Sequence, residues 1–235
     1  MSSPRRLLGH PDGVHLVLML ALTFTTGIVD AVGYLGLDRV FTANMTGNVV
    51  ILGMALAGGN GLPILGPVLA LVGFALGAVT GGRLLRGRPS HWNERSTAAF
   101  GTTGVVATLL GVGAVVAVPA EHSPWAFAIT VLLAVAMGLQ AASARRIGVK
   151  DVTTVVVTST LTGLAADSRL GGGSSENWPR RLLAVVLILA GAAAGALLLR
   201  VVGERGLGVG MIVAGVLSLV VALTGHRLRV RGEQH

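Results

Sequence analysis

Six long, uninterrupted apolar stretches dominate this chain of 235 residues. A helix needs about 20 apolar residues to cross the roughly 30 Å hydrocarbon core of a bilayer, so each stretch can form one transmembrane helix. Charged residues make up 12% of the chain, whereas a soluble domain carries about 25%. The composition therefore predicts an all-α integral membrane protein. The six predicted spans are residues 14–36, 62–82, 98–118, 125–146, 180–201 and 206–225.

Two further apolar stretches, residues 40–58 and 152–168, are shorter and rich in Thr, Asn and Ser. Each could cross the membrane, or enter and leave it on one side. If all eight stretches cross and the N-terminus is inside, 8 Lys and Arg residues lie inside and 10 outside. If the short stretches do not cross, 15 lie inside and 3 outside, as the positive-inside rule requires. We therefore predict six spans, two re-entrant or broken short helices, and both termini in the cytoplasm.

The chain also contains a weak internal duplication. Residues 40–48 align with residues 151–160 with one gap, at an offset of 111 to 112 residues, and Gly27 then corresponds to Gly138. Each half has the order span, short segment, span, span. Because three spans are an odd number, the second half must be inverted relative to the first. The predicted parts are an N-terminal tail (1–12), two membrane repeats (13–118 and 119–226) and a C-terminal tail (227–235).

The two short segments are predicted to meet near the bilayer midplane, which is a recurring plan of transporters and channels. Irregular backbone is tolerated in hydrocarbon only where protein buries it or water reaches it, and a conducting path supplies that water. Hydroxyl and amide side chains suit helix N-caps, and free N–H groups at a helix start attract anionic or polar solutes. Helix packing alone is the alternative explanation of such polar clusters. The predicted path residues are Asn44, Thr46, Gly47, Asn48, Thr158, Ser159 and Thr160, and we expect the two helices to start near Thr46 and Thr158.

Asp30 is the one acidic residue well within a predicted span, and Tyr34 lies on the same helix face. A carboxylate inside a membrane is costly, so Asp30 is a candidate proton carrier or cation ligand. The alternative is that Asp30 accepts hydrogen bonds from the re-entrant backbone, or pairs with Arg39, and so holds the hairpin. Gln140 lies near the corresponding place in the second half, although not on the matching face.

Other chemistry has little support in the sequence. The chain has no cysteine, which excludes disulfides and thiolate chemistry, and its histidines show no metal-binding spacing, so we expect no metal and no cofactor. The net charge of +8 lies between apolar runs, where it meets lipid headgroups, so we expect no nucleic-acid partner. Small-xxx-small repeats let helices pack closely, within the chain or across a homodimer. They comprise Gly73, Gly77 and Gly81 in one stretch and Gly191 and Gly195 in another.

Several of these motifs together resemble a known family. Residues 27–31 and 41–48 (Phe-Thr-Ala-Asn-Met-Thr-Gly-Asn), followed by residues 140–146 and 153–162, are similar to the YoaK family of bacterial membrane proteins. The resemblance covers nearly the whole chain. It implies a multi-pass protein of the bacterial inner membrane and implies no substrate, because the family has no assigned function.

The leading functional hypothesis is a small-solute transporter or channel whose path is formed by the two midplane half-helices. The second hypothesis is a non-transporting membrane scaffold or assembly protein, whose glycine-rich faces would bind a partner. An intramembrane enzyme has the least support, because Asp30 alone offers a titratable group at membrane depth. We therefore expect no enzymatic activity.

Overall fold

The computed structural model of this chain describes residues 11–87, 92–148, 157–173 and 178–232, and all regular secondary structure within these residues is helical. The all-α prediction is confirmed, and each predicted stretch contains one helix. The long helices are α2 (Pro11–Gly36), α4 (Leu65–Leu84), α5 (Glu94–Val116), α6 (Pro124–Ile147), α8 (Trp178–Val202) and α9 (Gly206–Gly232). The short helices are α3 (Met45–Leu56) and α7 (Val157–Ala166), and two 3-10 turns, η1 (Arg169–Gly171) and η2 (Gly203–Arg205), complete the list.

Polar caps and a left-handed glycine set several helix ends. The Asn93 side chain accepts hydrogen bonds from two backbone N–H groups in the first turn of α5, each at 3.0 Å. Helix α5 therefore begins at Glu94 rather than at the predicted residue 98. Ser123 caps α6 in the same way, and Gly148 ends α6 with a φ of 64°. These signals lie outside the apolar runs, so hydropathy alone underestimated the helix lengths.

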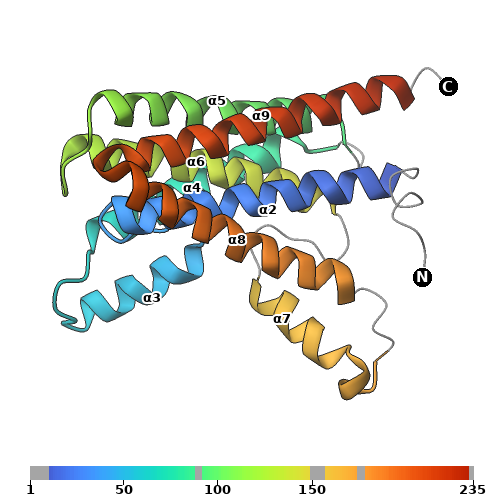
Figure 1. The fold of residues 1–235 in the computed structure, drawn as a ribbon, viewed down its shortest axis with the longest axis horizontal. Coiled ribbons are helices and arrows are strands. Elements are labelled where there is room, and N and C mark those ends of the chain that lie inside the picture. Colours follow the sequence, from blue (N-terminus) through green and yellow to red (C-terminus); the bar gives the residue numbers. More distant parts are fainter. Residues whose placement is uncertain (1–10, 88–91, 149–156, 174–177, 233–235) are drawn as a thin grey trace.

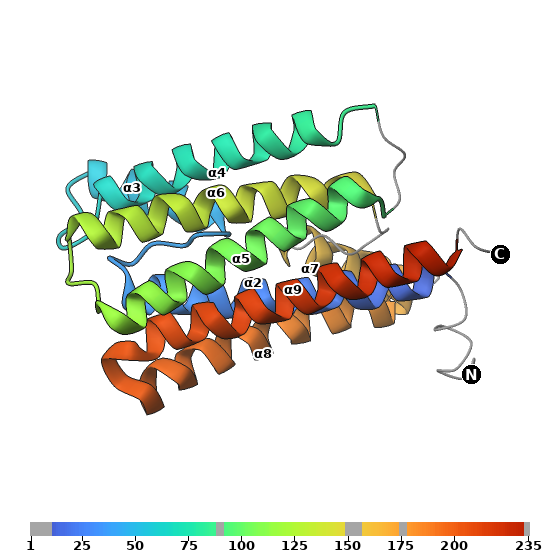
Figure 2. The same ribbon diagram turned by 90° about the horizontal axis from the view of Figure 1, so that it is seen from above.

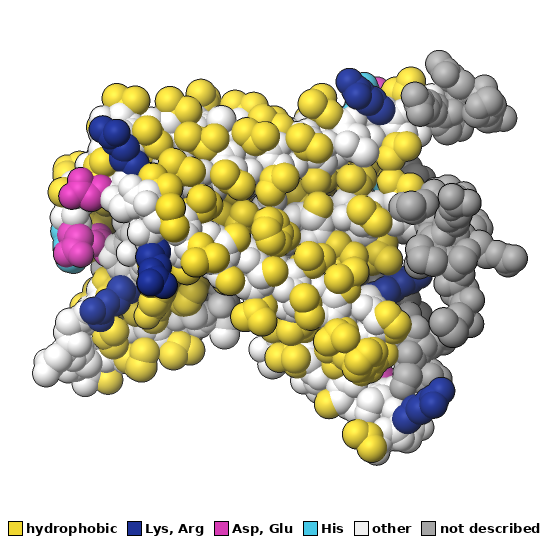
Figure 3. Space-filling view, in the orientation of Figure 1, with side chains coloured by type: hydrophobic (Ala, Val, Ile, Leu, Met, Phe, Trp, Pro, Cys, Tyr) yellow, Lys and Arg dark blue, Asp and Glu magenta, His cyan; other side chains and the backbone are white. Residues whose placement is uncertain are grey.

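The helices are long and apolar enough to cross a membrane. Five segments meet that standard within the described residues, and the fifth of them, Trp178–Val230, contains both α8 and α9. A broad band of hydrophobic side chains covers the flank of the bundle, whereas charged side chains gather toward its two ends (Figure 3). Leu76, Leu109 and Leu189 on this flank are 58%, 65% and 69% exposed, as expected for side chains that contact lipid.

The long helices form three close pairs, α2 with α8, α4 with α6 and α5 with α9 (Figures 1 and 2). Glycines at the crossings give the helix directions. A side-chain carbon added at Gly191 of α8 would lie 3.2 Å from the backbone nitrogen of Ile28, and one added at Gly195 would lie 3.0 Å from the Cβ atom of Ala31. Because these contacts advance along both helices together, α2 and α8 run parallel.

The α4–α6 pair has the same arrangement. A carbon added at Gly77 of α4 would lie 3.0 Å from the backbone nitrogen of Leu139, and one added at Gly81 would lie 2.9 Å from the Cβ atom of Ala142. Helices α4 and α6 therefore also run parallel. The glycines predicted to mediate close packing are thus used within the chain, and the predicted homodimer remains a prediction.

Helices α5 and α9 cross in opposite directions. A carbon added at Gly104 would lie 2.8 Å from the carbonyl oxygen of Gly215, and one added at Gly111 would lie 2.6 Å from that of Gly208. Residue numbers rise along α5 while they fall along α9, so the two helices are antiparallel. No side chain larger than hydrogen fits at these four positions without separating the helices.

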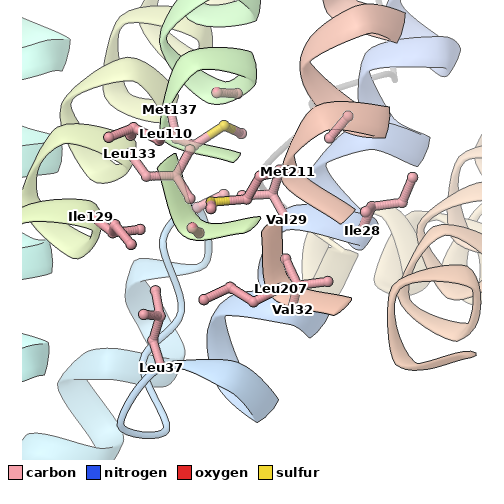
Figure 4. Close-up of a cluster of buried hydrophobic side chains, with 14 of the residues drawn as sticks. Ile28, Val29, Val32, Leu37, Leu110, Ile129, Leu133, Met137, Leu207 and Met211 are labelled. Carbon is pink, nitrogen blue, oxygen red and sulfur yellow. The ribbon is translucent and has the colours of Figure 1, made fainter. Parts of the chain in front are cut away.

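Two clusters of buried hydrophobic side chains fill the bundle, and α2, α5, α6 and α9 supply most of both. The first cluster includes Val29 of α2, Leu110 of α5, Leu133 of α6 and Met211 of α9 (Figure 4). The second cluster lies toward the N-terminal end of α2 and is built on Phe100 and other side chains. Its further members include Leu16, Met19, Leu22, Trp92, Ala144, Ile147 and Val221.

The two short helices lie outside this core. Helix α3 packs on α4, and α7 packs on α8. They diverge from one side of the bundle, and their N-terminal ends are the ends nearer its middle (Figure 1). The space-filling view shows an indentation between them (Figure 3). Each short helix therefore rests on one long helix and leaves part of its apolar surface exposed.

Candidate functional site

The candidate site in the first half is the irregular segment between α2 and α3, residues 37–44. Asp30 of α2 holds this segment. Its Oδ1 atom accepts hydrogen bonds from the backbone N–H groups of Ala43, at 2.8 Å, and Asn44, at 3.2 Å. Asp30 is 8% exposed. The carboxylate thus binds the re-entrant backbone, which is the structural alternative considered for this residue.

Arg39 does not form the alternative ion pair with Asp30. Its Nη1 atom donates a hydrogen bond to the carbonyl oxygen of Gly61, at 3.2 Å. Arg39 also has a positive φ of 52°, which is unusual outside glycine. Asp38 accepts hydrogen bonds from the backbone N–H of His122, which connects the segment to the α5–α6 loop. The segment is therefore anchored at its start as well as at its end.

Asn48 fixes the middle of the segment from within α3. Its Nδ2 atom donates to the carbonyl oxygen of Phe41 at 2.6 Å, and its Oδ1 atom accepts from the Phe41 backbone N–H at 3.0 Å. Asn48 has no exposed surface. One amide side chain therefore satisfies both backbone groups of a residue that lies outside any helix, as buried polar backbone requires.

Helix α3 begins two residues before the predicted start. Asn44 is its N-cap, and its side chain accepts a hydrogen bond from the backbone N–H of Gly47 at 3.4 Å. Thr46, which was predicted to begin the helix, is exposed on its first turn. Tyr34 stacks on the Phe41 ring, with ring centroids 4.7 Å apart. The first-half candidates thus form one connected cluster.

This cluster lies at a definite height on α2. Asp30 is six residues before the C-terminal end of α2, or about 9 Å along the axis at a rise of about 1.5 Å per residue. The tip of the segment therefore reaches inward from the end of α2 but stops short of the middle of the helix. Helix α3 then leads from this depth back toward the same end.

The second-half candidates lie on two separate elements. Thr158 and Ser159 are exposed on α7, and Thr160 is 8% exposed. Gly163 contacts the Arg181 side chain, so α7 lies beside the first turn of α8. The predicted second tip, residues 149–156, lies outside the described residues. The structure thus places the two sets of candidates near opposite ends of the bundle.

Gln140 lies on α6 and is 1% exposed. Within the part of the chain that the structure describes, neither its Nε2 nor its Oε1 atom has a hydrogen-bond partner. Thr42, in the first-half segment, is fully buried, and its hydroxyl likewise has no partner there. Sequence reasoning did not select Thr42, although it lies in the Phe-Thr-Ala-Asn motif. Within the described residues, no group of three or more His, Cys, Asp and Glu side chains could hold a metal ion.

Together, the apolar helices and the buried polar segment define a multi-pass α-helical membrane protein in contact with the lipid bilayer. The chain belongs to the family described as "Protein of unknown function (DUF1275)", which matches residues 18–223. It is similar to the "UPF0700 transmembrane protein YoaK" of Bacillus subtilis (strain 168), with 34% identity over 152 residues. The resemblance to the YoaK family is therefore confirmed.

The alignment covers 64% of this chain, and the chain spans 65% of the length of that relative. No solved structure matches the chain.

Proposed function

We propose that the protein is a small-solute transporter or channel of the bacterial inner membrane, built from two inverted repeats of three spans each. The observation that carries the proposal is a packing geometry that occurs twice. A carbon added at Gly27 would meet the carbonyl oxygen of Ile188 and, at 2.8 Å, the backbone nitrogen of Ala192. A carbon added at Gly138 would meet the corresponding groups of Phe74 and, at 2.9 Å, Ala78.

The residue numbers of these two contacts are related by fixed offsets. Gly138 follows Gly27 by 111 residues, and Ile188 follows Phe74 by 114. The reciprocal contacts obey the same rule, because Gly191 packs against Phe24 and Ile28, whereas Gly77 packs against the residues 111 positions after those two. An exchange of the two halves thus leaves the pattern unchanged. That supports a two-fold relation between residues 13–118 and 119–226.

Helix directions support six spans rather than eight. Helix α2 is parallel to α8, which turns at η2 into α9; α9 is antiparallel to α5, and α6 is parallel to α4. The short α5–α6 connection reverses the chain once more, so α2 and α4 point in opposite directions. In this arrangement the chain between α2 and α4 returns to the end it left, and α3 does not cross. The positive-inside rule then favours a cytoplasmic location for both termini.

Inverted repeats with short, discontinuous helices are a recurring architecture of transporters and channels. Here the irregular segment beside Asp30 supplies non-helical backbone within the span of α2. Such backbone persists in a membrane where protein buries it or where it borders a hydrated path. The candidate path residues are Asp30, Tyr34, Asn44 and Asn48 in the first half, with Thr46 and Gly47 on the first turn of α3. Gln140, Thr158, Ser159 and Thr160 are the candidates in the second half.

The scaffold hypothesis, a second candidate, relied partly on free glycine faces that would bind a partner. The described glycines of α4 and α8 instead pack against α6 and α2. That use removes one argument for a scaffold and favours transport. No enzymatic step is part of the proposal.

Single cysteines test the topology, because the natural chain has none. We would introduce Asn60→Cys, Arg88→Cys and Val149→Cys and label intact cells with a membrane-impermeant maleimide. We expect labelling from outside at position 60 and only after permeabilisation at positions 88 and 149. The reverse pattern would mean eight spans and would overturn the inverted-repeat arrangement.

Flux from proteoliposomes tests transport itself. The purified protein would be reconstituted and assayed with a panel of small cations, anions and uncharged solutes, against protein-free liposomes. We expect at least one solute to cross faster with the protein present. Asp30→Asn should change that flux or its pH dependence if the carboxylate carries a proton or cation. Protein-dependent flux of no solute in the panel would count against a transporter, whereas unchanged flux in the variant would remove that role from Asp30 alone.

A further inference from the structure

A layer of buried polar side chains separates the two hydrophobic clusters of the bundle. Thr25 and Thr26 of α2 are each 2% exposed, Thr103 of α5 and Gln140 of α6 are each 1% exposed, and Ser218 of α9 is 3% exposed. On α6, Gln140 falls between Met137 of the first cluster and Ala144 of the second. The same interval on the other three helices contains the hydroxyl residues. The interior is therefore apolar toward both ends and polar between them.

Contacts between α5 and its neighbours place three of these residues at one level. The Thr103 hydroxyl donates a hydrogen bond to the carbonyl oxygen of Ala136 on α6, at 3.0 Å. Gln140 is about one helical turn from Ala136. A carbon added at Gly104 would lie 2.9 Å from the backbone nitrogen of Leu219, the residue after Ser218. Thr103, Gln140 and Ser218 are therefore within about a turn of one another along the bundle axis.

The threonines of α2 lie at the same level. A carbon added at Gly36 of α2 would lie 3.2 Å from the Cβ atom of Leu207 of α9, and Gly210 packs against Val32. Residue numbers thus fall along α2 while they rise along α9. Since both helices rise equally per residue, eight residues from each of Val32 and Gly210 lead to Phe24 and Ser218. Thr25 is adjacent to that point, which is also close to the middle of α2.

The hydrogen bonds of this layer leave it rich in free acceptors. The hydroxyls of Thr25 and Thr26 both donate to the carbonyl oxygen of Leu22, at 2.8 Å, and that of Ser218 donates to the carbonyl oxygen of Ala214, at 3.0 Å. A hydroxyl has one proton and two lone pairs, so each of these oxygens can still accept but no longer donate.

Gln140 differs from these hydroxyls, because its amide has no partner within the described residues. Its two N–H groups and its carbonyl oxygen are buried with their hydrogen-bonding capacity unused, and such burial is costly. A molecule that enters the layer would satisfy this amide. It would meet one strong donor, the Gln140 Nε2 group, and several acceptors.

Charge restricts what such a molecule can be. Within the described residues, none of the polar side chains of the layer carries a formal charge. The carboxylate of Asp30 lies one turn from Thr26 and is directed at the backbone of Ala43 and Asn44. An ion would therefore enter the centre of the bundle without a charged partner, at a high desolvation cost.

We propose that the Gln140 amide is the central binding contact for a small uncharged molecule that has both hydrogen-bond donors and an acceptor. This inference rests on the proposed transport function and specifies its substrate class. The bound molecule accepts a hydrogen bond from Nε2 of Gln140 and donates to Oε1 and to the hydroxyl oxygens around it. Urea, glycerol and water each have these groups and serve as probes.

The test is stopped-flow light scattering on proteoliposomes that contain the full chain. Water flux is read from osmotic shrinkage, and urea and glycerol flux from the re-swelling that follows. The test variants are Gln140→Met, which keeps the length of the side chain without its amide, and Gln140→Leu. The matched control is Thr80→Val, because the Thr80 hydroxyl donates to the carbonyl oxygen of Leu76 on an exposed helix face. Thermal unfolding of each purified variant verifies that it is folded.

We expect the natural chain to pass at least one of the three probes faster than protein-free liposomes do. Gln140→Met should reduce that flux roughly tenfold, the equivalent of one or two lost hydrogen bonds, and Thr80→Val should leave it unchanged. If a folded Gln140 variant passes the probe as fast as the natural chain, the inference is wrong although transport stands. If none of the three probes passes, the uncharged substrate class is wrong, and ion flux in the wider panel decides the transport function separately.

Discussion

A glycine-to-alanine series at the helix crossings would measure how closely the paired helices approach. The main substitution is Gly138→Ala on α6. The added carbon would lie 2.9 Å from the backbone nitrogen of Ala78 and closer still to the carbonyl oxygen of Phe74. Both atoms belong to the α4 backbone, which cannot rotate away as a side chain would. The pair must therefore separate.

The cost can be worked from two opposing effects. Overpacking in a well-packed core costs about 1–3 kcal/mol, and a gap of about 0.5–1 Å along the crossing forfeits a quarter to a half of the dispersion energy there. Alanine regains about 0.8–1.0 kcal/mol over glycine from helix propensity. The net expectation is a free energy of unfolding lower by about 1–2 kcal/mol. That corresponds to a fall of roughly 5 °C in the midpoint of thermal unfolding.

The assay is thermal unfolding of the purified protein in detergent. Gly101→Ala on α5 is the matched control, because a carbon added there has nothing within 4 Å; it should be neutral or slightly stabilising. Gly27→Ala should lose about as much stability as Gly138→Ala, since the two crossings are alike. If Gly138→Ala were as stable as Gly101→Ala, the close α4–α6 crossing would be refuted. A large difference between the Gly27 and Gly138 variants would refute the equivalence of the two halves.

Three further predictions concern the segment between α2 and α3, and thermal unfolding measures each. Asp30→Asn keeps an acceptor for the bound N–H groups and should change stability little, whereas Asp30→Leu leaves both without a partner and should lower the free energy of unfolding by about 2–4 kcal/mol; equal stability of these variants would contradict the anchoring role. Asn48→Asp loses the donor to the Phe41 carbonyl oxygen, with an expected loss of about 2–3 kcal/mol, whereas an unchanged midpoint would mean that this clamp does not form. Gly47→Ala places a carbon 2.6 Å from the Phe41 ring and should lose about 1–3 kcal/mol, while Gly53→Ala, with nothing within 4 Å, should lose nothing.

The helices could be predicted from the sequence because hydropathy acts over a whole segment. Each apolar run is longer than the signals at its ends, so the six long helices and two short ones were located within a few residues. The ends depend on single side chains instead. Helix α3 starts after Asn44 rather than at Thr46, because the asparagine side chain reaches a backbone N–H group that the hydroxyl of Thr46 does not cap. Hydropathy carries no information on such a choice.

The role of Asp30 could not be decided from the sequence. A buried carboxylate with backbone donors nearby and one that binds a proton or cation look alike in a helical pattern, and only the fold brings Ala43 and Asn44 to it. Gln140 was chosen for its position near the end of a repeat, and its burial without a partner depends on the packing of four helices. Pairwise contacts between distant helices are what a single sequence lacks.

The crossing of α5 and α9 at Gly104 and Gly215 has a consequence for the origin of the protein. Those two glycines are 111 residues apart, the offset of the duplication, so each occupies its counterpart's place in the other half. Such a contact joins a surface to a copy of itself, as in a symmetric dimer. An ancestral chain of half this length would have needed no new interface to pair with an oppositely inserted copy. Gene fusion would then have fixed an orientation that the ancestor adopted in both directions.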